Sequence, residues 1–200
     1  MANFWQNVNL EPKRGFRFLL SVEGGSIGQS QGSAGTVGIS QFLIKRVKKP
    51  AVAVGESPHN FLNHTFFYPG RFTWQEVNFD IVDTVDPTAN ASKQVMQLLE
   101  ASGYELPTTP SAARDRQSMS KKASVTGLGT VQIKTLNAEG VVIETWVLNN
   151  AWVKTADFGS LDYGTEDLLN VAIGLRYDNA YLSVAGDKNY PTTPGVNVPA

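Results

Sequence analysis

The stretch LDYGTEDLLNVAIGLRYDNAYL (residues 161–182) changes side-chain character at every second position. Its large side chains share one face of an extended chain: Leu169, Val171, Ile173, Leu175 and Tyr177. The opposite face carries Asn170, Ala172 and Gly174. This period of two predicts a β-strand with one buried face. Acidic residues stand at both ends, so two interpretations are open: a carboxylate site, or a strand that meets another copy of the protein.

The same alternation recurs earlier in the chain, in residues 16–23, 39–47 and 73–82 and twice within 131–153. The tetrapeptide NAEG joins the last two runs and predicts a hairpin, with Asn137 and Gly140 available for positive φ. Strands this close together leave no room for βαβ crossovers. We therefore predict a mainly β protein, an antiparallel β-sandwich or barrel, with one flanking α-helix.

The helix is expected at about residues 91–102. Asn90 or Ser92 can cap its start, an apolar stripe follows, and Gly103 suits its end. Long loops are expected at about 24–38, 48–70 and 107–126. The sequence thus predicts a single domain over residues 1–182, followed by a C-terminal arm or extension over 183–200.

Bulk composition excludes several classes of function. The chain has 200 residues, 17 Lys and Arg against 18 Asp and Glu, a net charge of -1 and no cysteine. A near-neutral chain has no overall field to attract polyanions, and the lack of cysteine excludes disulfides and thiolate chemistry. No leader pattern and no membrane segment is expected, so we predict a soluble chain made in the cytosol.

No residue pattern predicts catalysis, a cofactor or a metal. His59 and His64 are the only histidines, and no orienting carboxylate follows at a recognisable spacing. The glycine-rich segment before residue 39 leads into a strand, whereas a phosphate-binding loop leads into a helix. The strand-end acids are better explained as turn residues than as a glycosidase pair.

Two other segments suggest contacts. KRVKK (residues 45–49) could meet phosphate or an acidic partner, or could keep an edge strand soluble. The segment 50–70 holds too many large apolar side chains for a solvated loop, so we expect it to pack on a surface.

The order of these features resembles the tail tube proteins of contractile-tailed bacteriophages, a family related to the inner-tube proteins of type VI secretion and contractile bacteriocins. The first similar patch is FRFLLSVEG with FLIKRVKKPAVAVG, an opening hairpin that runs into a Pro-containing loop. The second is FYPGRFTWQEVNFDIVDT, followed directly by the helix. The third, from residue 133 to 180, is a hairpin, an acidic LDY turn and the closing strand.

The resemblance implies a structural subunit that closes into a hexameric ring with a continuous inner β-barrel. Stacked rings would form a hollow tube that houses the tape-measure protein and conducts the genome, with no specific binding of the passing DNA. The implied partners are other copies of the chain, the tail sheath, the tape-measure protein, the baseplate hub and the tail terminator. The implied location is the virion tail, with assembly in the host cytoplasm.

Site residues follow from this implied assembly. Contacts between subunits are expected at Pro50, Val52, Val54, Phe61, Leu62, Phe66, Phe67, Tyr68 and Trp74. Asn170, Ala172 and Gly174 are expected to face the lumen or a neighbour. Because cationic contacts add affinity for DNA, we expect a neutral to acidic channel wall, with the basic segment 45–49 away from it.

Two alternatives remain open. One is the inner-tube protein of a type VI-like or bacteriocin-like injection system. The other is a carbohydrate-binding β-sandwich module that presents Trp74, Trp146 and Trp152 on its strands. An enzyme is the least supported class.

Overall fold

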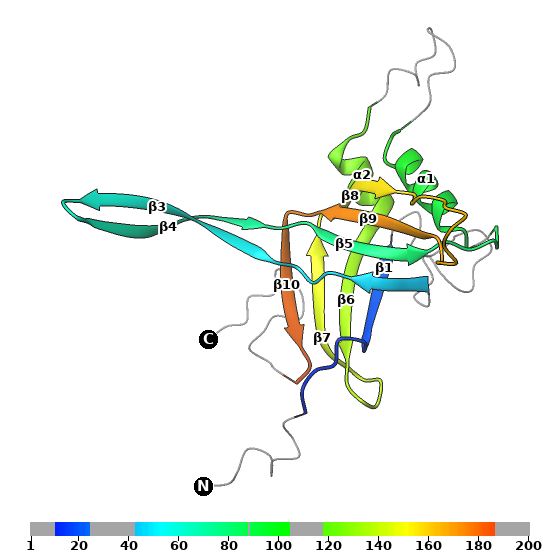
Figure 1. The fold of residues 1–200 in the computed structure, drawn as a ribbon, viewed down its shortest axis with the longest axis horizontal. Coiled ribbons are helices and arrows are strands. Elements are labelled where there is room, and N and C mark those ends of the chain that lie inside the picture. The colour runs from blue at the N-terminus through cyan, green and yellow to red at the C-terminus, as the bar shows by residue number, and fades with distance from the viewer. Residues whose placement is uncertain (1–10, 25–42, 88, 105–117, 187–200) are drawn as a thin grey trace.

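The computed structural model describes residues 11–24, 43–87, 89–104 and 118–186. These ranges are mainly β, as predicted (Figure 1). The elements are β1 (Phe18–Gly24), β2 (Ile44–Val47), β3 (Val52–Phe61), β4 (His64–Trp74), β5 (Val77–Val82), α1 (Ala91–Ala101), α2 (Lys121–Leu128), β6 (Gly129–Leu136), β7 (Val142–Asn149), β8 (Trp152–Asp157), β9 (Asn170–Arg176) and β10 (Asn179–Val184).

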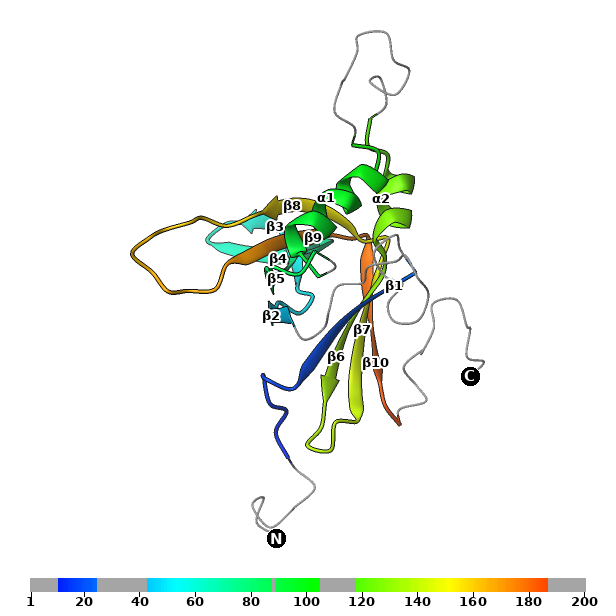
Figure 2. The same ribbon diagram turned by 90° about the vertical axis from the view of Figure 1, so that its right-hand side faces the viewer.

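Two four-stranded antiparallel sheets pack on each other. The first sheet has the strand order β1-β6-β7-β10, and the second has the order β2-β5-β9-β8. Figure 2 shows the first sheet beneath the second, with the two helices at one end. The inward side chains of both sheets form one apolar core, which includes Leu20, Val131, Ile133, Leu148, Phe79, Ile81, Ile173 and Leu175. The predicted antiparallel sandwich is therefore confirmed. Burial of this apolar surface holds the two layers together.

The alternating stretch that predicted the fold is strand β9. Val171, Ile173 and Leu175 are buried, as is Tyr177 just after the strand. Beside it, β5 pairs through Phe79 and Ile81, which lie opposite Ile173 and Val171. Both strands direct their apolar faces inward, so the predicted periodicity is confirmed.

The β6–β7 hairpin also forms as predicted, although Asn137 does not adopt positive φ. Gly140 has a φ of 79°, whereas Asn137 acts through its side chain. Its Oδ1 accepts hydrogen bonds from the backbone N–H groups of Glu139 and Val141 at 3.0 and 2.8 Å. This Asx turn fixes the reversal of the chain.

The predicted helix is α1. The side chain of Asn90 accepts a hydrogen bond from the Lys93 N–H at 2.7 Å, and Gly103 follows with a φ of 101°. The prediction of a single helix was wrong, because α2 lies where part of a loop was expected. Its short sequence lacks an apolar stripe, and it packs through Gly127, whose backbone approaches Leu98 and Ala101 of α1.

Two other boundaries differ from the prediction. Residues 48–70 were expected as a loop, but β3 and β4 form a hairpin across most of that range. Strand β10 continues to Val184 and pairs with β7, so the predicted boundary at residue 182 falls inside a strand. Most of the predicted loop 24–38 and residues 187–200 lie outside the described residues.

Neither helix in the described part of the chain has the length and apolar character needed to cross a bilayer.

Candidate assembly site

Strands β3 and β4 form a two-stranded ribbon, here called the arm (Val52–Trp74), that projects from the sandwich (Figure 1). It pairs from Val52 opposite Trp74 to Phe61 opposite His64, and it joins neither of the other sheets. Every side chain of β3 is exposed, as is every side chain of β4 except Trp74. A two-stranded ribbon alone is marginally stable in water, so the arm is the element that would gain most from a partner.

Large apolar side chains cover both faces of the arm. They are between 46% and 87% exposed, and they comprise Val52, Val54, Phe61, Leu62, Phe66, Phe67, Tyr68 and Phe72. Seven of these eight are predicted contact residues, and Phe72 is the addition. Exposed apolar groups in such number on one element mark an interaction surface.

The arm tip, residues 60–65, contains an unfavourable backbone conformation. Leu62 has a φ of 53°, a left-handed conformation that costs a leucine about 1–2 kcal/mol. Its side chain is also 87% exposed. The Thr65 hydroxyl donates a hydrogen bond to Asn60 Oδ1 at 2.9 Å and braces the turn. A residue that suits neither its conformation nor its exposure in the monomer points to a role in contact.

A β-bulge lies midway along the arm. The pairing register shifts between Val54 and Glu56, where the backbones of Gly55 and Gly70 pass close together. A Cβ on Gly70 would lie 3.1 Å from the carbonyl carbon and oxygen of Gly55. Bulges increase the local twist of a ribbon, so this pair of glycines sets the direction in which the arm tip points.

The base of the arm is fixed to the sandwich. Trp74 is half-buried, with its ring centroid 5.4 Å from that of Phe72 and 5.8 Å from that of Tyr177. The Gln75 N–H donates to the Ala51 carbonyl at 2.8 Å and closes the ladder. Of the predicted contact residues, Trp74 thus packs within its own subunit, and Pro50 is half-buried before β3.

A buried carboxylate joins the arm base to the N-terminal segment. Glu144 of β7 accepts hydrogen bonds from Lys13, from Lys49 at 2.7 Å and from the Trp146 indole N–H at 2.8 Å. Burial alone would raise the pKa of this carboxyl group, but the three donors lower it to about 2. Because Lys49 precedes β3, this ion cluster holds the chain where the arm begins.

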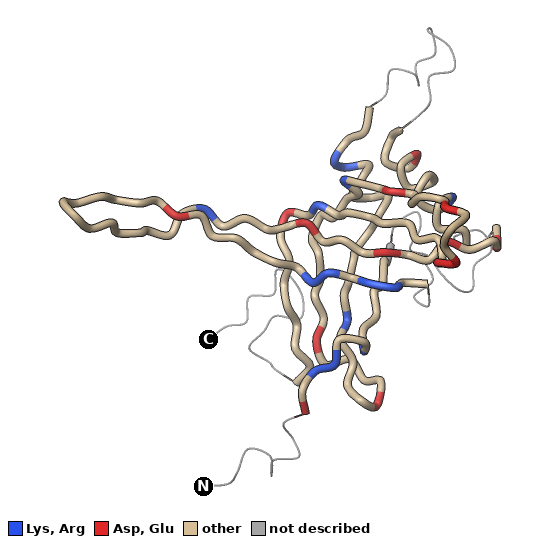
Figure 3. The backbone as a smooth tube through the Cα atoms, in the orientation of Figure 1, with Lys and Arg blue, Asp and Glu red and all other residues tan. Residues whose placement is uncertain are grey.

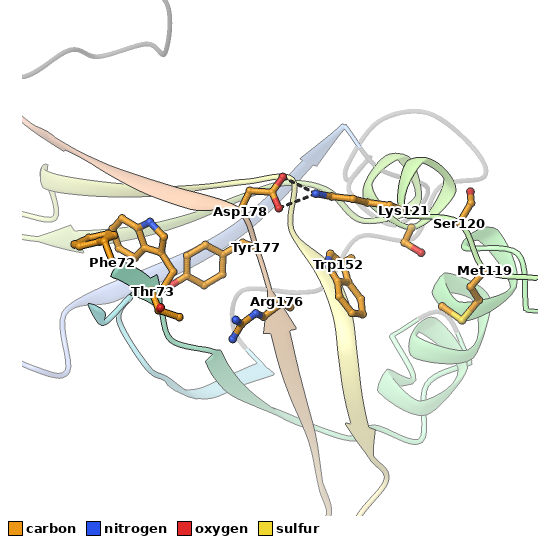
Figure 4. Close-up of a pocket in the computed structure, with 11 residues that line it drawn as sticks. Phe72, Thr73, Met119, Ser120, Lys121, Trp152, Arg176, Tyr177 and Asp178 are labelled. Atoms are coloured by element: carbon orange, nitrogen blue, oxygen red, sulfur yellow. Dashed lines mark hydrogen bonds and ion pairs between the residues drawn. The ribbon is translucent and has the colours of Figure 1, made fainter. Parts of the chain in front are cut away.

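An aromatic pocket of about 670 Å³ lies between the arm base and α2 (Figure 4). Its lining includes Phe72, Trp74, Met119, Trp152 and Tyr177. At its rim Lys121 donates to both carboxylate oxygens of Asp178 at 2.7 Å. These hydrogen bonds, together with one from Asn150, lower the pKa of the Asp178 carboxyl group. The buried Tyr177 hydroxyl has no hydrogen-bond partner among the described residues, and burial raises its pKa.

The three residues predicted to face a lumen or a neighbour lie on the outer face of the second sheet, and they differ in exposure. Ala172 is exposed and Asn170 is half-buried. Gly174 is buried, because the Thr155 side chain covers it: a Cβ there would lie 2.2 Å from Thr155 Oγ1. Glycine at this position therefore makes room for a neighbouring strand of the same subunit.

Ion pairs neutralise cations on and beside this face. Arg46 lies 2.7 Å from Asp80, and Glu76 pairs with Lys154 and, at 3.8 Å, with Arg176. The hydrogen bond from Lys154 lowers the pKa of the Glu76 carboxyl. A face built this way presents little unpaired positive charge.

The basic segment 45–49 is dispersed by the fold. Strand β2 is an edge strand of the second sheet, and basic residues lie along it (Figure 3). Lys45 on this strand and Lys48 just after it are exposed. Arg46 and Lys49 instead form ion pairs with Asp80 and Glu144. The exposed lysines on this edge strand agree with the interpretation that the segment 45–49 keeps a sheet edge soluble.

Three of the strand-end acids have structural roles, and the two histidines lie on the arm. His59 and His64 are exposed on the arm. Asp83 accepts hydrogen bonds from the Ala91 N–H at 2.9 Å and the Ser92 hydroxyl at 2.6 Å, at the start of α1. Asp157 and Asp162 accept from the N–H groups of turn glycines. Among the described residues no group of three His, Asp or Glu side chains could hold a metal.

A scan against protein-family models and a search of curated proteins found no match. Solved structures do share the fold. A chain of the anti-feeding prophage baseplate has a TM-score of 0.58 and 16% sequence identity, covering 88% of this chain and 98% of its own length. A chain from the sheath/tube terminator of the PVC extracellular contractile injection system has a TM-score of 0.57 and 15% identity, covering 87% and 98%.

A third similar chain comes from the PVC sheath-tube complex in the extended state. Its TM-score is 0.56 at 16% identity, and the match covers 92% of this chain and 99% of that one. The chain therefore has the fold found in baseplate, terminator and sheath-tube assemblies of contractile injection systems. This confirms the fold of the single chain that the family resemblance implied.

Sequence reasoning found the apolar side chains of the arm but missed the pocket. Met119, Trp152 and Tyr177 come from three separate segments, and only the packed fold brings them together. The one available signal was the aromatic residues at the end of β4 and the start of β8, which does not reveal which rings meet.

Proposed function

We propose that this protein is a structural, non-enzymatic subunit of the inner tube of a contractile tail, in which hexameric rings stack into a hollow tube. In its specific form the tube is that of a bacteriophage: it houses the tape-measure protein and conducts the genome into the host. The arm carries the proposal, because an exposed apolar ribbon of this length has no use in an isolated monomer.

Ring formation would resolve two problems of the monomer. It would cover the arm with a neighbouring subunit, and it would pair the exposed edges of the sheets. Edge strands β2 and β8 stand on opposite sides of the second sheet, so a neighbour on each side could extend that sheet into a continuous barrel.

The outer face of the second sheet is the proposed channel wall. Ala172 and Asn170 lie on it, and its arginines and lysine are ion-paired. Unpaired Lys and Arg would bind phosphates through counterion release and slow the passing DNA. A wall of paired charges supports passage without specific binding. Lys48 is the exception: its charge helps to lower the pKa of Glu76, so part of the basic segment lies near this face rather than away from it.

The partners in this proposal are those of a tail: the sheath, the tape-measure protein, the baseplate hub and the tail terminator. The similar chains in sheath-tube, terminator and baseplate assemblies support contacts of this kind. The protein would assemble in the host cytoplasm and reside in the virion tail.

A second candidate is the inner tube of an injection device rather than of a virus. The similar chains come from the anti-feeding prophage and from an extracellular contractile injection system, and they favour this alternative. Purified particles would separate the two: encapsidated DNA supports the phage tail, whereas protein cargo without DNA supports the injection device.

A carbohydrate-binding module has weaker support. Trp74 and Trp152 do line one pocket, but Trp146 lies on β7 and donates its indole N–H to the buried Glu144. The three tryptophans therefore do not form a shared platform for a sugar ring.

Negative-stain microscopy of the purified protein tests the proposal. The wild type should form rings or tubes with a central hole. Phe66→Glu and Phe67→Glu place a charge on opposite faces of the arm, and each should give folded, soluble subunits that form no tubes. Val141→Glu alters an exposed apolar residue outside the arm and should assemble normally. Tubes of normal length from both arm variants would refute the role of the arm.

A further inference from the structure

The aromatic pocket at the arm base has the size and the apolar lining of a binding pocket. It is open and mainly apolar, and its volume of about 670 Å³ is within the range of about 300–1,000 Å³ typical of binding pockets. Tyr177 is only 4% exposed, yet its hydroxyl has no hydrogen-bond partner among the described residues. That hydroxyl is shielded from solvent, so an occupant would contact the aromatic rings of the lining rather than this oxygen.

The arm tip is the segment of this chain whose chemistry fits. It presents Phe61 and Leu62, and residues 60–65 carry no acidic or basic side chain other than His64.

The arm tip differs in charge from a second exposed apolar segment, the β8–β9 loop. The β8–β9 loop, which projects in Figure 2, exposes Leu161, Tyr163 and Leu168 but also carries Asp162, Glu166 and Asp167. Among the described residues that line the pocket, both cations already have an acidic partner: Lys121 is paired with Asp178, and Arg176 lies 3.8 Å from Glu76. Neither is left to receive three carboxylates. The uncharged tip is therefore the better occupant.

The tip cannot occupy the pocket of its own subunit. Phe72 and Trp74 line the pocket at one end of the arm, and the β3–β4 ladder runs from there to Phe61 at the other end. Ten residues of β3 span about 33 Å at the usual rise of a strand. An arm tip that fills this pocket therefore comes from a second copy of the chain.

We propose that the aromatic pocket receives the arm tip, Phe61 and Leu62, of a second copy. The inference rests on the proposed function, and it assigns the surface that the arm contacts. Tip and pocket are different surfaces, so the contact is heterologous: each subunit gives one tip and accepts another. Repetition of such a contact produces closed rings or stacked filaments, not isolated dimers.

Disulfide trapping tests this contact cleanly, because the chain has no cysteine of its own. Leu62→Cys would be combined with Met119→Cys or, on the other side of the pocket in Figure 4, with Thr73→Cys. A bond forms only when the two Cα atoms approach within about 7 Å. After oxidation of assembled protein with diamide, we expect covalent ladders longer than dimers on a non-reducing gel, reversed by dithiothreitol. Each single-cysteine variant can give dimers at most.

Leu62→Cys with Tyr163→Cys is the matched control, since Tyr163 is fully exposed and lies outside the pocket. It should give no ladder. Rings under the microscope without a ladder from either pocket pair would overturn the pocket assignment and leave the tube proposal standing. A ladder from the Tyr163 pair but from neither pocket pair would also overturn it. Wild-type protein that forms no rings contradicts the tube proposal independently of the trapping result.

Discussion

The indole ring of Trp74 packs on the phenol ring of Tyr177, with 5.8 Å between the ring centroids and 55° between the ring planes. Trp74 is the last residue of the arm, and Tyr177 follows β9 in the core of the sandwich. This contact joins the exposed ribbon to the buried sheet. The arm therefore extends from a fixed base, which reduces the entropy lost when its tip binds.

Trp74→Ala should lower the free energy of unfolding by about 2–4 kcal/mol, because it removes a large ring that packs against the core. Phe72→Ala is the matched control: its ring is mostly exposed, so it should cost less than about 1 kcal/mol. Urea denaturation of the monomer, followed by tryptophan fluorescence or circular dichroism, measures both. If both variants lost the same free energy of unfolding, the Trp74 ring would stabilise the monomer no more than the exposed Phe72 ring does.

Glu144 should give the protein a specific sensitivity to acid. Its pKa is about 2 in the folded state against an ordinary 4.5, so the ionised form favours folding. The stabilisation is complete above pH 4.5 and is lost as pH falls from 4.5 toward 2. The pKa difference corresponds to at most about 3 kcal/mol. We expect about 1–2 kcal/mol, since Lys13 and Lys49 are about half exposed.

Glu144→Gln should therefore reduce stability near pH 7 by that amount, and the difference from wild type should shrink toward pH 2. Unfolding curves from pH 2 to pH 7 measure this. Glu139→Gln makes the same charge change in the exposed β6–β7 turn and should alter stability by less than about 0.5 kcal/mol. A Glu144→Gln effect that is equal at all pH values would contradict an ionic origin.

The core strands could be predicted from sequence because one face of each is buried. In β5 and β9 every second residue is apolar, and Phe79 and Ile173 meet in the core as that period requires. The arm shows no such period, since both faces are exposed in the monomer and both carry apolar groups. Pro58 and Pro69 also lie in the arm, where each strand of the two-stranded ribbon has a free edge that tolerates proline.

The candidate site was predictable only in part. The clustered apolar residues in 50–70 indicated a contact surface, but they did not indicate its shape. The position of Trp74 within its own subunit depends on Tyr177, which is 103 residues further along the chain (177 − 74). Likewise, α2 has no apolar stripe because it packs through the backbone at Gly127. Contacts of this kind exist only in the folded chain.

Gly174→Ala should destabilise the second sheet by about 1–3 kcal/mol, because its Cβ would lie 2.2 Å from Thr155 Oγ1. Thr155→Ala removes that oxygen and should cost less than about 1 kcal/mol on its own. The double variant should recover a large part of the loss, since the two changes affect one contact. A double-mutant cycle from thermal or urea unfolding measures the coupling. Purely additive losses would show that the strands do not approach as closely as this.

Leu62→Asn should separate the stability of the monomer from its assembly. Asparagine tolerates the left-handed conformation at φ 53°, so the variant should be as stable as wild type, or more stable by up to about 1 kcal/mol. Assembly should weaken, because burial of a leucine contributes about 1.5–3 kcal/mol, or about tenfold to a hundredfold in the concentration needed to form rings. Sedimentation across a dilution series measures that concentration, and thermal unfolding of dilute protein measures the stability of the monomer.

Asn63→Ser changes the adjacent turn residue but keeps the apolar tip, and it should assemble like wild type. If Leu62→Asn formed rings at the wild-type concentration, the leucine side chain would not be buried between subunits, and its unfavourable conformation would need another explanation.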